Sequence, residues 1–181
     1  YCPFIQILEG DVGLTGFVYL RDGVYMLALY ECERGGLQFR EVHELKTSDA
    51  YLSGVIARLD MVYMDVPRSS VRFRILSFPF DERDKLDGVI PFQLQEMITE
   101  NVEDIVYDFT VVGKDDGNYR VAVCFADRDT VRGMRDDLAR FGIDPAVITS
   151  VEAHWSLPGN TLEGGGASGT PTDTDFHGRV R

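Results

Sequence analysis

The residues with the clearest chemical potential are Asp11, Gly13 and Thr15, in the stretch EGDVGLTGF. A glycine lets the backbone approach an anion closely, and successive backbone N–H groups in a turn can face phosphate oxygens. A carboxylate beside such a turn can help to position Mg²⁺. The three residues are therefore candidates for nucleotide binding. An Asp-x-Gly pair is a weak signal by itself, and an ordinary turn after a strand is the favoured alternative.

No other group of side chains has the spacing of a catalytic or metal site. The acidic run at 115–118, Asp-Asp-Gly-Asn, lacks the ligand spacing and final Glu of a calcium-binding EF-hand and is typical of a hairpin turn. The sequence has no G-x-S-x-G turn for a nucleophilic serine. The histidines share no ligand spacing with one another or with a cysteine: His43, His154 and His177. We therefore expect no catalytic residue, no metal site, no cofactor and no enzyme activity.

The cysteines Cys2, Cys32 and Cys124 form no C-x-x-C pair, and their number is odd. This pattern argues against a disulfide framework and against a zinc site, and it fits a reducing compartment. Cys124 lies in an apolar run, YRVAVCFA, which predicts a buried and unreactive thiol.

The overall charge is strongly acidic, because 18 Lys and Arg stand against 30 Asp and Glu, for a net charge of −12. Such a chain repels phosphate backbones and anionic lipid headgroups, which disfavours nucleic acid and a membrane surface as partners. No apolar run approaches the roughly 20 residues that span a bilayer, and no signal peptide opens the chain. The hydrophobic fraction of 44% in 181 residues predicts a packed core, in one ordinary domain or two small ones.

The elements that would position the Asp-x-Gly turn form the N-terminal part. Runs rich in β-branched and aromatic residues predict strands at 4–9, 15–22 and 24–31, with a hairpin at Asp22-Gly23. A weaker strand follows at 37–42. The apolar spacing within 47–61 predicts a helix, and 62–66 reads as a short buried strand.

The next part has the predicted order strand, helix, strand, strand, helix, strand between residues 71 and 151. The strands lie at 71–78, 104–113, 119–126 and 146–153, and the helices at 82–98 and 130–141. Pro91 inside the first helix predicts a bend, and Gly142 predicts the end of the second. This βαββαβ order is typical of a ferredoxin-like unit, a four-stranded antiparallel sheet with both helices on one face.

The predicted organisation is an N-terminal subdomain at 1–66, a βαββαβ subdomain at 67–152 and a linker or tail at 153–181. The last segment is rich in Gly, Ser, Thr and Pro, with almost no core-forming residues.

Four short motifs within residues 65–150, in this order and spacing, resemble the cytoplasmic part of the type II secretion system protein L family. They are similar, more loosely, to the type IV pilus assembly protein M. The motifs are Phe78-Pro79-Phe80, Pro91-Phe92-Gln93-Leu94, Val106-Tyr107-Asp108-Phe109 and Gly142-Ile143-Asp144-Pro145. The agreement over residues 1–64 is weaker.

The resemblance implies an α+β protein with a partial actin-like, ribonuclease H-like subdomain that carries an inserted ferredoxin-like subdomain. It also implies a scaffold on the cytoplasmic side of the bacterial inner membrane. Its protein partners would be the secretion ATPase and neighbouring platform proteins, and a homodimer is compatible with this role. It would contact the membrane only through a segment absent from this chain.

Two alternatives belong to other classes of protein. One is a nucleotide-binding actin-like ATPase of the pilus M kind, with ATP and Mg²⁺ at Asp11, Gly13 and Thr15. Against it, Leu14 to Phe17 follow the Asp-x-Gly, where the pilus relatives carry a Ser/Thr-rich turn and then a lysine. The other is an unrelated small enzyme or a ligand-binding ferredoxin-like domain, which would need a deep pocket with convergent polar groups.

Overall fold

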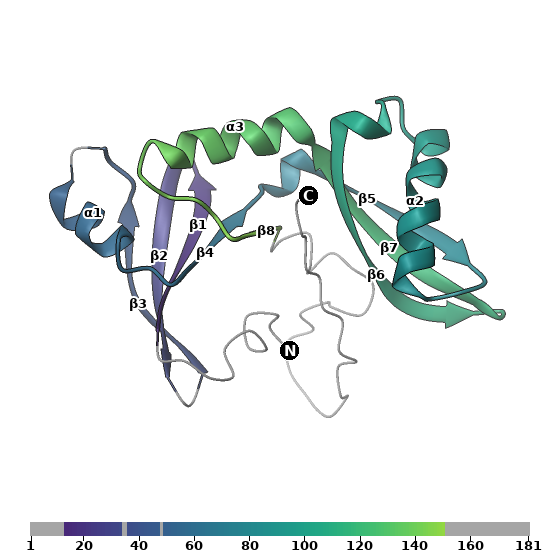
Figure 1. Cartoon of the computed structure of the whole chain (residues 1–181), viewed down its shortest axis with the longest axis horizontal. Helices are drawn as coiled ribbons and strands as arrows, with labels where there is room; N and C mark the ends of the chain where they lie inside the picture. Colours follow the sequence, from purple (N-terminus) through teal and green to yellow (C-terminus); the bar gives the residue numbers. More distant parts are fainter. Residues whose placement is uncertain (1–12, 34–35, 48, 151–181) are drawn as a thin grey trace.

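The computed structural model describes residues 13–33, 36–47 and 49–150, which form two β-sheets and three α-helices (Figure 1). The first sheet has the strand order β3-β2-β1-β4-β8, and the second has the order β5-β7-β6. The strands are β1 (Gly13–Arg21), β2 (Val24–Glu33), β3 (Gly36–Glu44), β4 (Met61–Asp65), β5 (Val71–Phe78), β6 (Ile105–Asp115), β7 (Asn118–Asp127) and β8 (Val147–Thr149). The helices are α1 (Ala50–Ile56), α2 (Arg83–Met97) and α3 (Arg128–Ala139), with short 3-10 helices η2 (Arg68–Ser70) and η3 (Val102–Asp104).

The first sheet begins with the predicted hairpin between β1 and β2. Its turn residues Asp22 and Gly23 have φ of 52° and 79°, the positive values that a tight turn between twisted strands requires. β3 continues the antiparallel order, whereas β4 is parallel to β1 and β8 is parallel to β4. These directions and this order are those of the ribonuclease H-like half of an actin-like fold, as expected.

Helices α1 and α3 cover the same face of the first sheet. Alternate strand residues point to opposite faces, so the strand residues in the shared core identify that face. The core contains Val18, Leu27 and Met64 from the strands, Leu52 and Val55 from α1, and Val131, Met134 and Leu138 from α3. Past α3, Gly142 has φ of 78°, and the Ile143 N–H donates to the Leu138 carbonyl at 3.1 Å, which ends the helix as predicted.

The predicted four-stranded ferredoxin-like sheet is wrong, although its six elements occur in the predicted order. The last strand, β8, pairs with β4 in the first sheet, with Val147 opposite Tyr63, and α3 packs on that same sheet. The reason is that parallel strands need a crossover connection. α3 supplies the crossover from β4 to β8, and the β5-α2-β6-β7 unit is inserted between β4 and α3.

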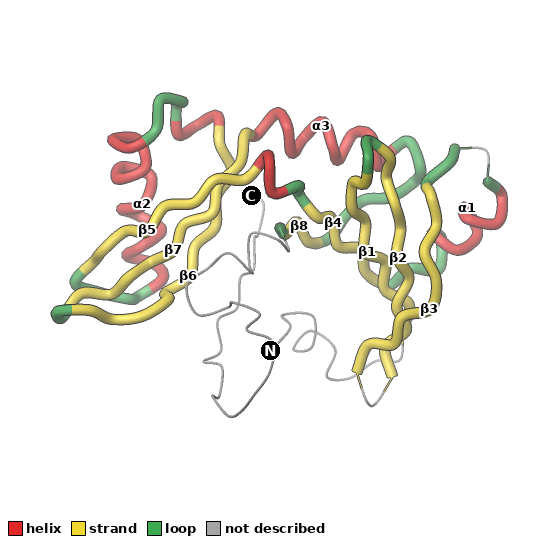
Figure 2. The backbone as a smooth tube through the Cα atoms, turned by 180° about the vertical axis from the view of Figure 1, so that it is seen from behind, coloured by secondary structure: helices red, strands yellow, loops and turns green. Residues whose placement is uncertain are grey.

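The inserted unit has its own core between α2 and one face of the second sheet (Figure 2). α2 contributes Leu86, Ile90 and Leu94, each fully buried. The helix runs unbroken through Pro91, and its N-cap is Glu82. The acidic run at 115–118 forms the β6–β7 hairpin, with φ of 45° at Asp116 and 83° at Gly117.

Candidate functional site

The structure places Gly13, which was expected in the turn, in strand β1 together with Thr15, whereas Asp11 lies outside the described residues. The predicted first strand, 4–9, also lies outside them. Thr15 is 4% exposed, between Tyr30 of β2 and Met61 of β4. The nucleotide-binding role of these three residues therefore stays a prediction.

The side-chain carboxylate of Asp60 is hydrogen-bonded to the backbone next to Gly13. The Leu14 N–H donates to Asp60 Oδ2 at 2.8 Å, and the Asp60 N–H donates to the Leu14 carbonyl at 2.9 Å. A Cβ atom on Gly13 would lie 2.7 Å from Asp60 Oδ2, so the glycine is needed for this close approach. The Leu14 amide that could face a phosphate is thus hydrogen-bonded to an anion already.

The connection from β1 to β2, at Asp22-Gly23, lies at the end of β1 that is away from Gly13. Ligands of sheets with parallel strands usually bind beyond the carboxyl ends of those strands, which here are the ends of β1, β4 and β8. At β1 this end is a turn of only two residues, because Arg21 pairs directly with Val24.

Other side chains with chemical potential are not assembled into a reactive site in the described part of the chain. Those residues contain no group of three or more His, Cys, Asp or Glu that could hold a metal ion. Burial raises the pKa of the Cys124 thiol to about 12, with a further contribution from the Asp108 charge, so the thiol stays protonated near neutral pH. His154 and His177 lie outside the described residues. Among the described helices, none is long and apolar enough to cross a membrane.

A buried carboxylate lies in the inserted unit, where the sequence analysis assigned no role. Asp108 in β6 has a side chain only 10% exposed, and its Oδ1 accepts a hydrogen bond from Arg83 at 2.8 Å. Burial raises the pKa of Asp108 in spite of that arginine, and Oδ2 has no hydrogen-bond partner. The Arg83 guanidinium also lies 4.7 Å from the centre of the Phe109 ring. The sequence signal for this buried pair is an aspartate within the apolar strand IVYDFTVV, because a buried acid needs a partner.

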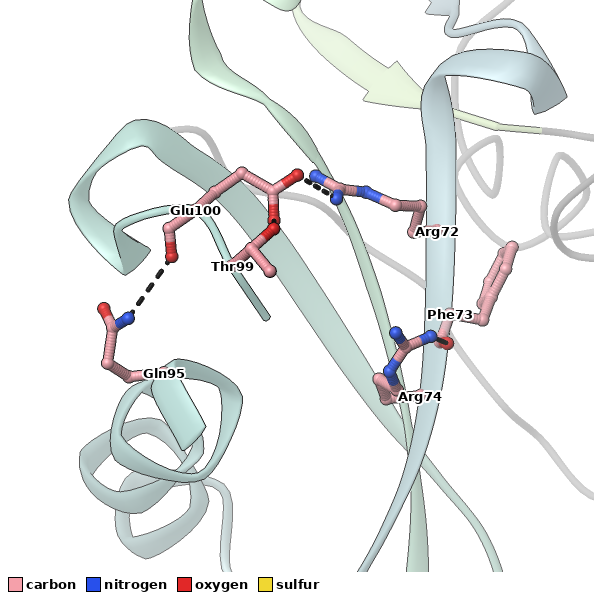
Figure 3. Close-up of polar contacts among 6 residues, drawn as sticks. All are labelled: Arg72, Phe73, Arg74, Gln95, Thr99 and Glu100. Carbon is pink, nitrogen blue, oxygen red and sulfur yellow. Dashed lines mark hydrogen bonds and ion pairs between the residues drawn. The ribbon is translucent and has the colours of Figure 1, made fainter. Parts of the chain in front are cut away.

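A second polar cluster joins the end of α2 to strand β5 (Figure 3). Arg72 forms an ion pair with Glu100, which also accepts a hydrogen bond from the Thr99 hydroxyl at 3.3 Å. Gln95 donates to the Glu100 carbonyl at 3.3 Å and accepts from the Val102 N–H at 2.9 Å. The hydrogen bond from Arg72 lowers the pKa of Glu100. The cluster fixes the loop after α2 against the edge of the sheet.

Large apolar side chains are exposed on the same unit. Phe92 and Met97 on α2 are 74% and 49% exposed, and Ile75 on β5 is 40% exposed. Ile75 lies on an edge strand, a common place of protein contact, whereas Phe92 and Met97 lie on the helix. The first sheet also exposes apolar residues, with Phe39 on the edge strand β3 at 58%.

The topology and the inserted unit define an actin-like fold. The cytoplasmic domain of EpsL, an inner membrane component of the type II secretion system of Vibrio cholerae, has a TM-score of 0.55 and 18% identity over 76% of this chain and 57% of that chain. The PilM-PilN type IV pilus biogenesis complex contains a chain with a TM-score of 0.60 and 15% identity over 77% of this chain and 47% of that chain.

These likenesses agree with the resemblance inferred from the motifs, and at such low identity they show a shared fold. The sequence matches no family model and no curated protein. The chain spans about half the length of the two structures that it resembles.

Proposed function

We propose that the chain is part of a cytoplasmic scaffold of an inner-membrane secretion platform, where it docks the secretion ATPase and neighbouring platform proteins. The observation that carries the proposal is the fold shared with the EpsL cytoplasmic domain, together with the apolar residues that the inserted unit exposes. Docking needs an exposed apolar anchor on a rigid element, and Phe92 on α2 meets both conditions.

The same proposal assigns the chain no catalytic role and no bound cofactor. Asp60 occupies the Leu14 amide, and the β1–β2 connection is a short hairpin. Both features leave little backbone to surround a triphosphate, which supports a scaffold over an ATPase.

Binding of the purified chain to the secretion ATPase of the same organism, measured by calorimetry, tests the docking role. We expect Phe92→Ser to weaken binding about tenfold or more, because exposed aromatic anchors often dominate an interface. Phe39→Ser, a comparably exposed phenylalanine on the first sheet, is the matched control and should bind as the parent chain does. Absence of binding, or equal loss in both variants, would contradict the role that we assign to the inserted unit.

The alternative is a nucleotide-binding ATPase of the pilus M kind, which rests on Asp11, Gly13 and Thr15. Equilibrium dialysis with Mg²⁺ and ATP separates the two functions. Tight Mg²⁺-dependent binding that Asp11→Ala abolishes would favour the alternative, and the scaffold proposal expects none.

A further inference from the structure

Strand β5 forms one edge of the second sheet, and its two faces differ in chemistry. Arg72 and Arg74 lie on the α2 side, with their guanidinium carbons 4.8 and 5.9 Å from the centre of the Phe125 ring. Phe73 and Ile75 alternate with them and therefore lie on the opposite side of the sheet. The edge thus presents Arg72 and Arg74 on one side and, on the other, the exposed Ile75 and the half-buried Phe73, with the Arg68 guanidinium 5.1 Å from the centre of the Phe73 ring.

The cationic side is only partly neutralised. Arg72 forms an ion pair with Glu100, whereas Arg74 has no carboxylate within ion-pair distance in the described part of the chain. Arg74 is exposed and donates a hydrogen bond to the Phe73 carbonyl at 2.8 Å. The guanidinium of Arg74 therefore lies along the strand, beside Phe73 (Figure 3).

The surrounding sequence makes this strip unusual for so acidic a chain. Positions 66–80 form the longest stretch of the sequence without an Asp or Glu, and they contain Arg68, Arg72 and Arg74. A positive strip on a protein with a net charge of −12 attracts acidic segments, while two copies of the chain repel each other at long range.

The other edge of the sheet, β6, is less suited to an added strand. Arg128 donates to the carbonyls of Glu103 and Ile105 at 3.0 and 2.9 Å, which occupies the backbone where β6 begins. Acidic residues at 103, 104, 108 and 115 lie along or next to this strand. Strand β5 has comparable backbone contacts, from Arg68 to the Val71 carbonyl at 2.9 Å and from Arg74 to the Phe73 carbonyl at 2.8 Å, so the two edges differ in charge rather than in free backbone.

We propose that β5 is extended by a strand from a partner protein in which acidic and apolar residues alternate. The partner backbone would pair with the outer row of β5 N–H and C=O groups, which an edge strand leaves without a strand partner. Its acidic side chains would lie beside Arg72 and Arg74, and its apolar side chains beside Phe73 and Ile75. This inference rests on the scaffold function and names the chemistry of its partner.

The test uses the full chain and a fluorescent peptide of alternating Glu and Val, about as long as the eight residues of β5. Two control peptides carry Lys in place of Glu, or the same residues with all Glu before all Val. We expect only the alternating acidic peptide to bind, with an affinity that falls as salt rises. Hydrogen exchange should slow at alternate amides of β5 and not along β6.

Arg74→Glu should weaken the peptide affinity about tenfold or more, because one attraction becomes a repulsion. Arg58→Glu is the matched control, since Arg58 is an exposed arginine without an ion pair among the described residues and lies far along the chain, after α1. If Arg74→Glu melts at a lower temperature than the parent, Arg74→Gln serves instead, and a several-fold loss is expected.

Three results would overturn the inference: no binding of the alternating peptide, equal binding of the lysine peptide, or a dimer in sedimentation that Arg74→Glu dissociates. The last result would assign the edge to a second copy. The peptide contains no secretion protein, so a failure here leaves the ATPase-docking result standing. If the peptide binds and the secretion ATPase does not, β5 would still be a strand-binding edge, but the ATPase would be rejected as its partner.

Discussion

The two sheets differ in how the chain builds them. The second sheet and α2 come from one continuous stretch, residues 71–127, in which β6 pairs with the next strand, β7, and β5 pairs with β7 across α2 and β6. The first sheet combines residues 13–65 with α3 and β8, which return after the insertion. The inserted unit is therefore built from one continuous segment, whereas the first sheet is complete only when the end of the described chain has folded back.

Both ends of the inserted unit pack in the core of the first sheet. Val71, the first residue of β5, and Ala126, near the end of β7, are 3% and 5% exposed and belong to the core of the first sheet. The inserted unit is thus anchored at both of its ends in a core other than its own. Movement of β5 by a bound partner would be transmitted directly to the packing of α3.

The largest expected effects come from substitutions that leave a cavity in one of the two cores. Leu138→Ala in α3 and Leu94→Ala in α2 each remove a fully buried side chain and should each lower the free energy of unfolding by about 2–5 kcal/mol. Because the cores are separate, Leu138→Ala should speed hydrogen exchange in β1, β4 and β8, and Leu94→Ala in β5, β6 and β7. Urea unfolding followed by mass spectrometry of exchanged peptides measures both effects. Faster exchange in the second sheet alone after Leu138→Ala would contradict the division.

This division also explains which parts the sequence could predict. In the inserted unit, the strands, the α2 helix and the turn at 115–118 follow from local patterns, and β6 and β7 are consecutive, although β5 pairs with β7 across α2 and β6. The same patterns at α3 and β8 identify a helix and a strand but not the sheet that they join. Their partners, Leu27 and Met64 for example, are more than sixty residues away in the sequence, and no local pattern encodes that distance.

The candidate sites show the same limit. The Asp-x-Gly pattern could not reveal that Asp60 would reach the Leu14 amide, because a side chain 46 residues away supplies that contact. The pairs Arg83–Asp108 and Arg72–Glu100 also join residues from different elements. The apolar run around Cys124 predicted a buried and unreactive thiol; Cys124 is half-buried in β7, and desolvation raises its pKa to about 12.

The next effect concerns the buried carboxylate of the inserted unit. Arg83→Ala should lower the free energy of unfolding by about 1–2 kcal/mol at neutral pH, because it leaves the ionised Asp108 buried without its charged partner. Burial already raises the pKa of Asp108, so the folded chain holds that proton more tightly than the unfolded chain. Stability contributed by this group is therefore present at low pH and falls as the pH rises from the unfolded pKa through the raised one.

Arg83→Ala should raise the pKa of Asp108 further, and its cost should disappear at a pH where Asp108 is protonated. Denaturant unfolding at several pH values measures the slope. Arg132→Ala removes an exposed arginine paired with an exposed Asp129 and should leave both stability and slope nearly unchanged. A cost for Arg83→Ala that stays constant down to acidic pH would mean that packing on Phe109, rather than charge, explains it.

A smaller effect compares the hairpin of each sheet. Gly23→Ala and Gly117→Ala should each lower the free energy of unfolding by about 1 kcal/mol, because φ of 79° and 83° disfavours a side chain although no atom lies within 4 Å of the added Cβ. Gly133→Ala is the control, since Gly133 lies inside α3 with open space around it and should gain up to about 1 kcal/mol in helix stability. Thermal melts of the three variants measure these changes. Equal losses at all three positions would contradict the role of the backbone angle, because Gly133 is not at positive φ.

The smallest effect concerns the ion pair at the edge of the inserted unit. The hydrogen bond from Arg72 lowers the pKa of Glu100, so the stability that the pair contributes is present above the ordinary pKa of a glutamate and is lost as the pH falls through the lowered value. Arg72→Gln should therefore lower the melting temperature slightly at neutral pH and low salt, and not in acid or high salt. An NMR titration should show the pKa of Glu100 rising toward its ordinary value in this variant. Arg74→Gln removes the neighbouring arginine, which stacks on the same Phe125 ring but has no carboxylate partner among the described residues, and should leave the Glu100 titration unchanged. An unchanged Glu100 pKa in Arg72→Gln would mean that the pair in Figure 3 does not hold the loop after α2 against β5.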